Sequence, residues 1–210
     1  PLIRWDLFHR IEQVVPQDYL DNIHRYETLL GSASFNIITE VILKSGEHRA
    51  LAVLRENSLP LAIKGFNQMK NVVGELAKRE STFAPYEQDC INIILQAQAM
   101  TEIETNMEVG FKQSSLAKSH YDSRVITAGG KRYNFKVCQW GQFGDEWRDM
   151  EIGKGGDIKS SSAKQAILIA EMIQMLSGEE FDCDRHENQY KILGNTIYVF
   201  DHGGMSLSKP

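Results

Sequence analysis

The period of the hydrophobic pattern changes along the chain, and this change limits the fold more than any other feature. Residues 26–55 are rich in β-branched side chains and predict extended runs that meet in a hairpin turn at Ser45-Gly46. From Phe66 onward, apolar residues recur at three- and four-residue steps, which indicates helices. Strand character then returns in residues 124–140.

Toward the C-terminal end, helix and strand patterns alternate in short segments. A run of serines favours a helix start just before the apolar stripe of residues 163–176. Residues 190–193 and 196–200 predict a final pair of strands. Residues 59–66 predict a strand or a connector, and the polar residues 111–123 predict an exposed loop. This order of elements predicts an α+β fold.

Composition describes an ordinary globular protein and excludes several classes. The 210 residues are 42% hydrophobic and 24% charged, which fits one domain or two small lobes. The net charge of -5 argues against a general nucleic-acid binder. No apolar run reaches the length of a membrane span, so none is predicted. The cysteines are Cys90, Cys138 and Cys183. Their odd number and wide spacing predict a reducing, cytoplasmic environment.

The densest polar cluster follows the last predicted helix. Residues 182–188 read Asp-Cys-Asp-Arg-His-Glu-Asn, and residues 201–203 read Asp-His-Gly at the end of the final strand. Phosphoryl transfer needs one carboxylate near the attacking hydroxyl and further oxygen ligands for a metal, and Asp184, Asn188 and Asp201 are of these types. Asp and Asn also form ordinary turns, which is the alternative for each motif alone. Their occurrence together favours a functional site.

These motifs resemble the catalytic and metal-binding loops of the protein kinase superfamily. The Asp-Arg-His order at 184–186 is similar to its atypical branches, the phosphoinositide-kinase-like and secretory-pathway kinases. The resemblance implies that Asp184 is the catalytic base, Asp201 the metal-binding residue of a DFG-like motif and Asn188 a second metal ligand. It also implies ATP and Mg²⁺ as cofactors. The spacing from Asp184 to Asn188 is four residues, where the family has five.

Two segments upstream add weaker similarity to the same family. The sequence from Gly31 through Ser32 to Ser34 resembles a kinase phosphate-covering loop, although it keeps only the first glycine. The segment that begins with Glu151 and Ile152 resembles the hinge that binds the adenine edge of ATP. A lone glycine in a β-turn and a surface loop are the respective alternatives.

The strand lysine of kinases, which grips the nucleotide phosphates, is missing. The resemblance places Val53 at that position. Arg55, Lys64 or Lys44 are the basic residues that could substitute for the lysine. Glu75, on the helix that follows, would be its ion-pair partner, and a solvated helix-face glutamate is the alternative.

The resemblance implies a two-lobed protein-kinase-like fold with a β-rich N-lobe and a shortened C-lobe. The expected division is a helical lead-in over 1–25, an N-lobe over 26–150 with a helical insertion at about 83–123, and a hinge with a reduced C-lobe over 151–210. Reduced kinases of this type occur among bacterial effectors delivered into host cells.

The implied activity is transfer of the γ-phosphoryl group of ATP to a protein hydroxyl, with a lipid head group as an alternative acceptor, and the need for an activating partner stays open. Three alternatives stay open: a phosphoinositide kinase, an enzyme that transfers AMP from ATP, and a pseudokinase that serves as a binding module. The missing strand lysine motivates the last two.

Overall fold

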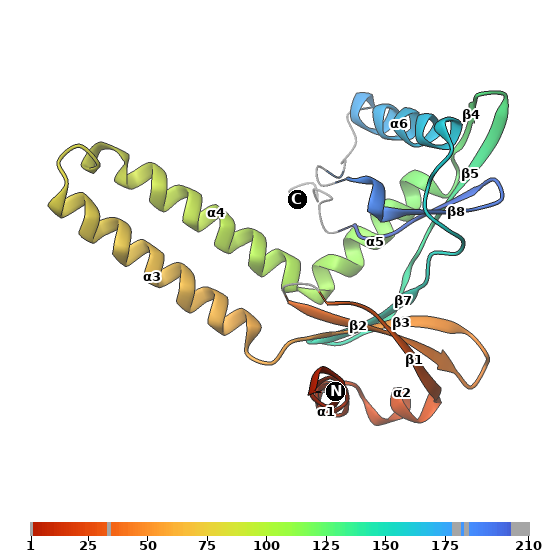
Figure 1. Ribbon diagram of the computed structural model, residues 1–210, viewed down its shortest axis with the longest axis horizontal. Coiled ribbons are helices and arrows are strands. Elements are labelled where there is room, and N and C mark those ends of the chain that lie inside the picture. The colour runs from red at the N-terminus through yellow and green to blue at the C-terminus, as the bar shows by residue number, and fades with distance from the viewer. Residues whose placement is uncertain (1, 33–34, 178–181, 183–184, 203–210) are drawn as a thin grey trace.

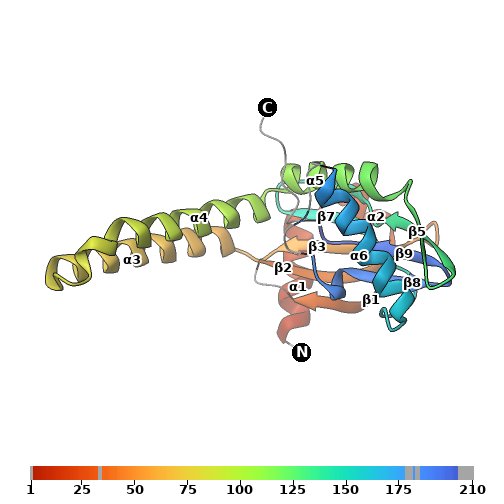
Figure 2. The same cartoon turned by 90° about the horizontal axis from the view of Figure 1, so that it is seen from above.

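The computed structural model describes residues 2–32, 35–177, 182 and 185–202, and it contains two β-sheets with a helical hairpin that projects from them (Figure 1). The fold is α+β, as the sequence predicts. Seen from above, the hairpin extends well beyond the rest of the molecule, whereas the other helices lie beside the sheets (Figure 2). Within these described ranges, no helix combines the length and the apolar character that crossing a membrane requires.

The first sheet is antiparallel, with the strand order β1-β2-β3-β7-β6. Two N-terminal helices cover one of its faces, where Ile11 and Tyr19 pack in one core with Val41, Leu51 and Trp147. Because side chains alternate along a strand, the other residues of β3 and β7 face the opposite side of the sheet. The elements of this layer are α1 (Leu2–Val14), α2 (Gln17–Asn22), β1 (Ile23–Ser32), β2 (Asn36–Leu43), β3 (His48–Leu54), β6 (Trp140–Phe143) and β7 (Trp147–Glu151).

The projecting hairpin consists of α3 (Ser58–Arg79) and α4 (Glu87–Thr105), joined through the short helix η1 (Ala84–Tyr86). The prediction of a strand or connector at 59–66 is wrong, because α3 begins at Ser58 and contains this segment. No residue of α3 is buried. The helical insertion therefore begins about 25 residues earlier than expected, counted from Ser58 to the predicted start at 83.

Residues 111–123 were predicted to form a loop, and this prediction is wrong: α5 (Met107–Tyr121) contains most of them. The Asn106 side chain caps this helix by accepting a hydrogen bond from the backbone N–H of Val109 at 3.1 Å. Ala117 and Tyr121 are fully buried on its inner face. The polar composition of the segment concealed a helix that buries one side and exposes the other.

The second sheet has the strand order β4-β5-β9-β8, with one parallel pair, β5 and β9. Helix α6 packs on it, and Ala163, Ala166 and Ala170 are fully buried in the same core as Phe135 and Ile197. The Ser160 side chain caps α6 by accepting from the backbone of Ala163, as the serine run predicts. The elements of this layer are β4 (Val125–Ala128), β5 (Lys131–Val137), α6 (Ser161–Leu176), η2 (Glu187–Gln189), β8 (Tyr190–Leu193) and β9 (Thr196–Val199).

The chain passes between the sheets three times, once through the helices α3, α4 and α5 and twice by short crossings. The first short crossing lies between β5 and β6, where the backbone N–H of Cys138 donates to the carbonyl of Val199 at 2.8 Å. The second is the segment after β7, which forms an isolated antiparallel bridge from Gly156 to Ile192 of β8. Strands β4 and β5 belong to the second sheet although they precede β6 and β7. The predicted lobe boundary near 150 therefore does not coincide with the division between the sheets.

Candidate functional site

The Arg185 side chain connects the two motif loops predicted from the sequence. Its Nη1 donates to the backbone carbonyls of Phe200 at 3.0 Å and Asp201 at 2.8 Å. These residues follow strand β9, whereas Arg185 precedes strand β8, so the β8–β9 hairpin returns the chain to its starting point. Residues 185–189 therefore lie beside residues 200–202.

Two further contacts fix the second guanidinium nitrogen. Arg185 Nη2 lies 3.3 Å from Asp182 Oδ2 and 2.5 Å from His202 Nδ1. Burial, followed by the positive charge of Arg185, lowers the pKa of His202 well below its usual value. His202 is therefore neutral at pH 7 and accepts through Nδ1, which leaves its proton on Nε2.

Aromatic rings surround the same guanidinium. Its central carbon lies 5.7 Å from the ring centre of Tyr121 and 5.9 Å from that of Tyr190. Both tyrosine hydroxyls donate to Glu171 of α6 at 2.6 Å. Although burial disfavours the charge of Arg185, the neighbouring Tyr121 and Asp182 hold its pKa above the ordinary value. Arg185 is therefore a permanently charged anchor, a role that the sequence motif alone does not indicate.

The turn between the motif and β8 is closed by a buried amide. Gln189 is 3% exposed, and its Oε1 accepts from the backbone N–H of His186 at 3.3 Å and from Arg185 Nη1 at 3.5 Å. The neighbouring Asn188 lies in η2 with its side chain exposed. Gln189 is thus structural, whereas the Asn188 amide faces solvent.

Asp201 has a special backbone conformation. Its φ is 57°, in the left-handed region that non-glycine residues seldom occupy, and its side chain is exposed. The hydrogen bond from Arg185 to its carbonyl supports this geometry. Strained conformations of this kind occur preferentially at functional sites. Asp184, the predicted catalytic base, lies outside the described residues.

The donor set at these loops suits magnesium better than a tightly caged metal. Across the described parts of the chain, no group of three or more His, Cys, Asp or Glu side chains is placed to hold an ion. Mg²⁺ bound with a nucleotide needs only one or two protein carboxylates, because phosphates and waters complete its shell. The exposed oxygens of Asp201 and Asn188 fit that requirement.

The predicted phosphate loop is described only in part. Gly31 pairs with Ile38 of β2, and a Cβ added to it would meet no atom within 4 Å. Ser32 closes β1 opposite Ile37, and Ser34 lies outside the described residues. The glycine is therefore not required by packing in this conformation.

The candidate positions for the basic residue lie in different parts of the structure. Val53 is fully buried in the core beneath α1 and α2, so its position cannot serve the opposite face of the sheet. Arg55 directly follows β3, and its backbone N–H donates to the carbonyl of Phe35 at 2.8 Å. It therefore flanks the segment that joins β1 to β2.

Two other predicted residues lie on the projecting hairpin. Lys64 and Glu75 are both exposed on α3, the helix that projects from the sheets (Figure 1). Glu75 is 2.8 Å from Lys78 and 3.9 Å from Arg79, both on its own helix. The structure therefore does not bring Lys64 or Glu75 to the motif loops, because the predicted strand is part of a helix that leaves the body. Lys44 lies just beyond β2, in the β2–β3 turn.

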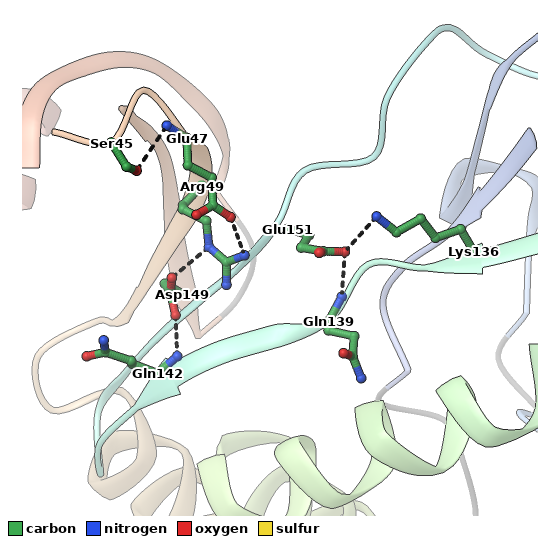
Figure 3. Close-up of polar contacts among 8 residues, drawn as sticks. All are labelled: Ser45, Glu47, Arg49, Lys136, Gln139, Gln142, Asp149 and Glu151. Carbon is green, nitrogen blue, oxygen red and sulfur yellow. Dashed lines mark hydrogen bonds and ion pairs between the residues drawn. The ribbon is translucent and has the colours of Figure 1, made fainter. Parts of the chain in front are cut away.

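The predicted hinge lies where the two sheets meet. The Glu151 carboxylate is 3.7 Å from Lys136 Nζ and accepts from the backbone N–H of Gln139 at 3.5 Å (Figure 3). Glu151 and Ile152 line a cavity of about 440 Å³, together with residues of the β2–β3 turn and Tyr198 of β9. This position gives the segment contact with both layers.

No protein-family model and no curated protein matches the sequence. Among solved structures, the chain is similar to the complex of Rv3197 with erythromycin from Mycobacterium tuberculosis, with a TM-score of 0.70 at 14% identity. The match covers 95% of this chain and 51% of that one, so the chain spans about half the length of its neighbour. At this identity the similarity concerns the fold alone.

Proposed function

We propose that this chain is an atypical kinase that transfers the γ-phosphoryl group of ATP to a protein hydroxyl with the help of Mg²⁺. The observation that carries the proposal is the Arg185 side chain, which joins the two loops bearing the kinase-like motifs. Catalysis of phosphoryl transfer depends mainly on positioning and charge stabilisation, and a buried cation that fixes two loops supplies positioning.

The proposed architecture is two-lobed. The five-stranded sheet with α1 and α2 would form the β-rich N-lobe, and the four-stranded sheet with α6 the shortened C-lobe. The segment from Glu151 to Gly156 would be the hinge, since it leaves the first sheet and is bridged to β8 of the second. The nucleotide would bind between the two sheets, next to the loop that contains Asp201.

Each residue then has a definite task. Asp184 orients the acceptor hydroxyl and accepts its proton. Asp201 and Asn188 present exposed oxygens for the metal. Bound Mg²⁺ neutralises negative charge on the β- and γ-phosphates. Arg185, whose guanidinium also bonds to His202, would hold the backbone of Asp201 in its left-handed conformation before the nucleotide binds.

Calorimetric titration with ATP, with and without Mg²⁺, tests this function. Wild-type protein is expected to bind ATP only with the metal, and Asp201→Ala is expected to abolish that binding. Asp145→Ala, which removes an exposed carboxylate from the turn between β6 and β7, is the matched control and should bind normally. ATP binding that survives Asp201→Ala would remove the metal assignment.

Labelled nucleotide separates the alternative activities. Transfer of label from γ-labelled ATP to protein supports the kinase, and transfer to phosphoinositide supports a lipid acceptor. Incorporation from α-labelled ATP supports AMP transfer. Tight binding without any transfer, tested with candidate activating partners present, supports a pseudokinase that serves as a binding module.

A further inference from the structure

The two faces of strands β3 and β7 carry different kinds of side chain. Val53 and Trp147, which are direct cross-strand partners, pack in the core beneath α1 and α2. The next pair, Ala52 and Arg148, therefore points to the opposite face of the sheet. On that face β3 offers only a small apolar side chain, and the positive charge comes from the neighbouring strand β7.

The Arg148 guanidinium is held in place by apolar contacts. Its central carbon lies 4.3 Å from the ring centre of Trp140, and Nη1 contacts Met107 Sδ at 3.7 Å. A Cβ on Gly110 of α5 would collide with the same indole ring, so α5 packs closely against Trp140 and fixes its position. The Arg148 guanidinium therefore stacks on an indole ring that α5 holds in position.

The hydrogen bonds of Arg148 are weaker than its apolar contacts. Its Nε is buried and has no hydrogen-bond partner among the described residues, and a thioether sulfur is a weak acceptor. Burial lowers the pKa of Arg148 to about 10, and the charges of Asp201 and Glu104 partly offset this effect. Buried charges are normally paired or hydrogen-bonded, so an anionic group is needed to complete this site.

We propose that Arg148 binds the phosphate groups of the nucleotide and replaces the lysine that β3 lacks. This inference rests on the proposed function, and it follows from the position of Arg148 beside Ala52, on the face of the sheet away from α1 and α2, and from its stacking over Trp140. A guanidinium can bind two phosphate oxygens at once, which suits the role.

Comparing ATP with adenosine isolates the phosphate contribution. Wild type, Arg148→Met and the exposed-residue control Arg132→Met are titrated with each ligand in Mg²⁺. Arg148→Met is expected to weaken ATP binding roughly ten- to hundredfold, the range for a lost hydrogen bond to a charged group. Adenosine affinity should stay within about twofold in all three proteins, because adenosine has no phosphate.

The possible results lead to different conclusions. Equal ATP affinity in wild type and Arg148→Met overturns the role of Arg148 but leaves the proposed function in place. Equal losses for ATP and adenosine show a purely structural arginine and also overturn the role. Absence of Mg²⁺-ATP binding by wild type overturns the proposed function and this inference together.

A measurement on the wild-type protein covers the case in which Arg148→Met does not fold. The Nε–Hε group of Arg148 is buried, and its resonance can be followed by NMR during titration with Mg²⁺-tripolyphosphate. The proposal expects this resonance to shift in step with binding, while that of exposed Arg132 stays constant. A binding curve without any shift at Arg148 overturns the proposal.

Discussion

The two sheets each bury an arginine to nearly the same extent, but they use its charge differently. Arg49 and Arg185 have side chains 8% and 6% exposed. Arg49 Nε lies 2.7 Å from Asp149 Oδ2, and both residues belong to strands of the five-stranded sheet (Figure 3). Arg185 instead bonds to loops that follow and precede strands of the four-stranded sheet. The first arginine holds strands together, and the second positions a site.

The largest expected effect comes from breaking the ion pair of the five-stranded sheet. Arg49→Met leaves the buried carboxylate of Asp149 without its cation and should lower the free energy of unfolding by about 3–5 kcal/mol. Urea denaturation followed by circular dichroism measures this loss. The double variant Arg49→Met/Asp149→Leu should recover more than half of it, because no charge is then buried alone. A single variant within 1 kcal/mol of wild type would contradict this view of the pair.

The next effect concerns the connection between the two sheets. Gly155 has a φ of +92°, and a Cβ there would collide with the backbone carbonyl of Ile192. Gly155→Ala should therefore destabilise the protein by about 2–4 kcal/mol, from left-handed strain together with overpacking. Gly156→Ala is the matched control, since a Cβ at Gly156 meets no atom within 4 Å. Thermal denaturation of the pair tests the comparison, and equal melting temperatures would refute it.

Local chemistry explains which elements could be predicted from the sequence. The turn at Ser45-Gly46 and the final hairpin are confirmed, and both turns contain a glycine with positive φ, Gly46 at 83° and Gly194 at 61°. The helix that begins after Ser160 is confirmed through its cap. Helix α5 was missed because its polar residues hide a buried stripe. The parallel pairing of β5 with β9 joins segments 60 residues apart, and no local pattern reports it.

The residues of the candidate site also divide into those that a local sequence pattern indicates and those whose position depends on the fold. The motif residues Asn188 and Asp201 could be proposed from sequence because their chemical types match a known pattern, although Asn188 follows Asp184 by four residues and not five. The contact of Arg185 with the carbonyls before His202 depends on how the β8–β9 hairpin folds back. The place of Arg148 depends on cross-strand register between β3 and β7. Register brings together residues that are distant in sequence, so a linear count placed Val53 where the residue that faces away from α1 and α2 is Ala52.

A smaller effect on stability, but a large one on binding, is expected at the four-stranded sheet. Arg185→Lys keeps a positive charge near Asp182 but loses the planar fork that reaches two loops. It should lower stability by about 1–2 kcal/mol and weaken Mg²⁺-ATP binding at least tenfold. Calorimetry and chemical denaturation on the same samples measure the two effects.

Arg124→Lys is the control for that change. Arg124 also lies over the Tyr121 ring, at 5.5 Å, and donates to the backbone carbonyl of Ala170, but that carbonyl belongs to helix α6 rather than to a motif loop. A similar loss of stability with unchanged nucleotide affinity is expected. If both variants lost affinity equally, Arg185 would have no special role in positioning the loops.

The smallest effect is expected at the junction between the sheets, where Cys138 reports on opening. Burial, with a contribution from Glu151, raises the pKa of the Cys138 thiol to about 12, so the reactive thiolate is scarce at pH 8. Iodoacetamide should leave Cys138 unmodified in native protein while it alkylates the half-exposed Cys90 of α4, as peptide mass spectrometry can show. In Gly155→Ala the alkylation of Cys138 should accelerate relative to Cys90, because the second short crossing no longer holds the sheets together. Rapid alkylation of Cys138 in the wild type would mean that the junction opens freely, and the two sheets could not then hold a fixed site between them.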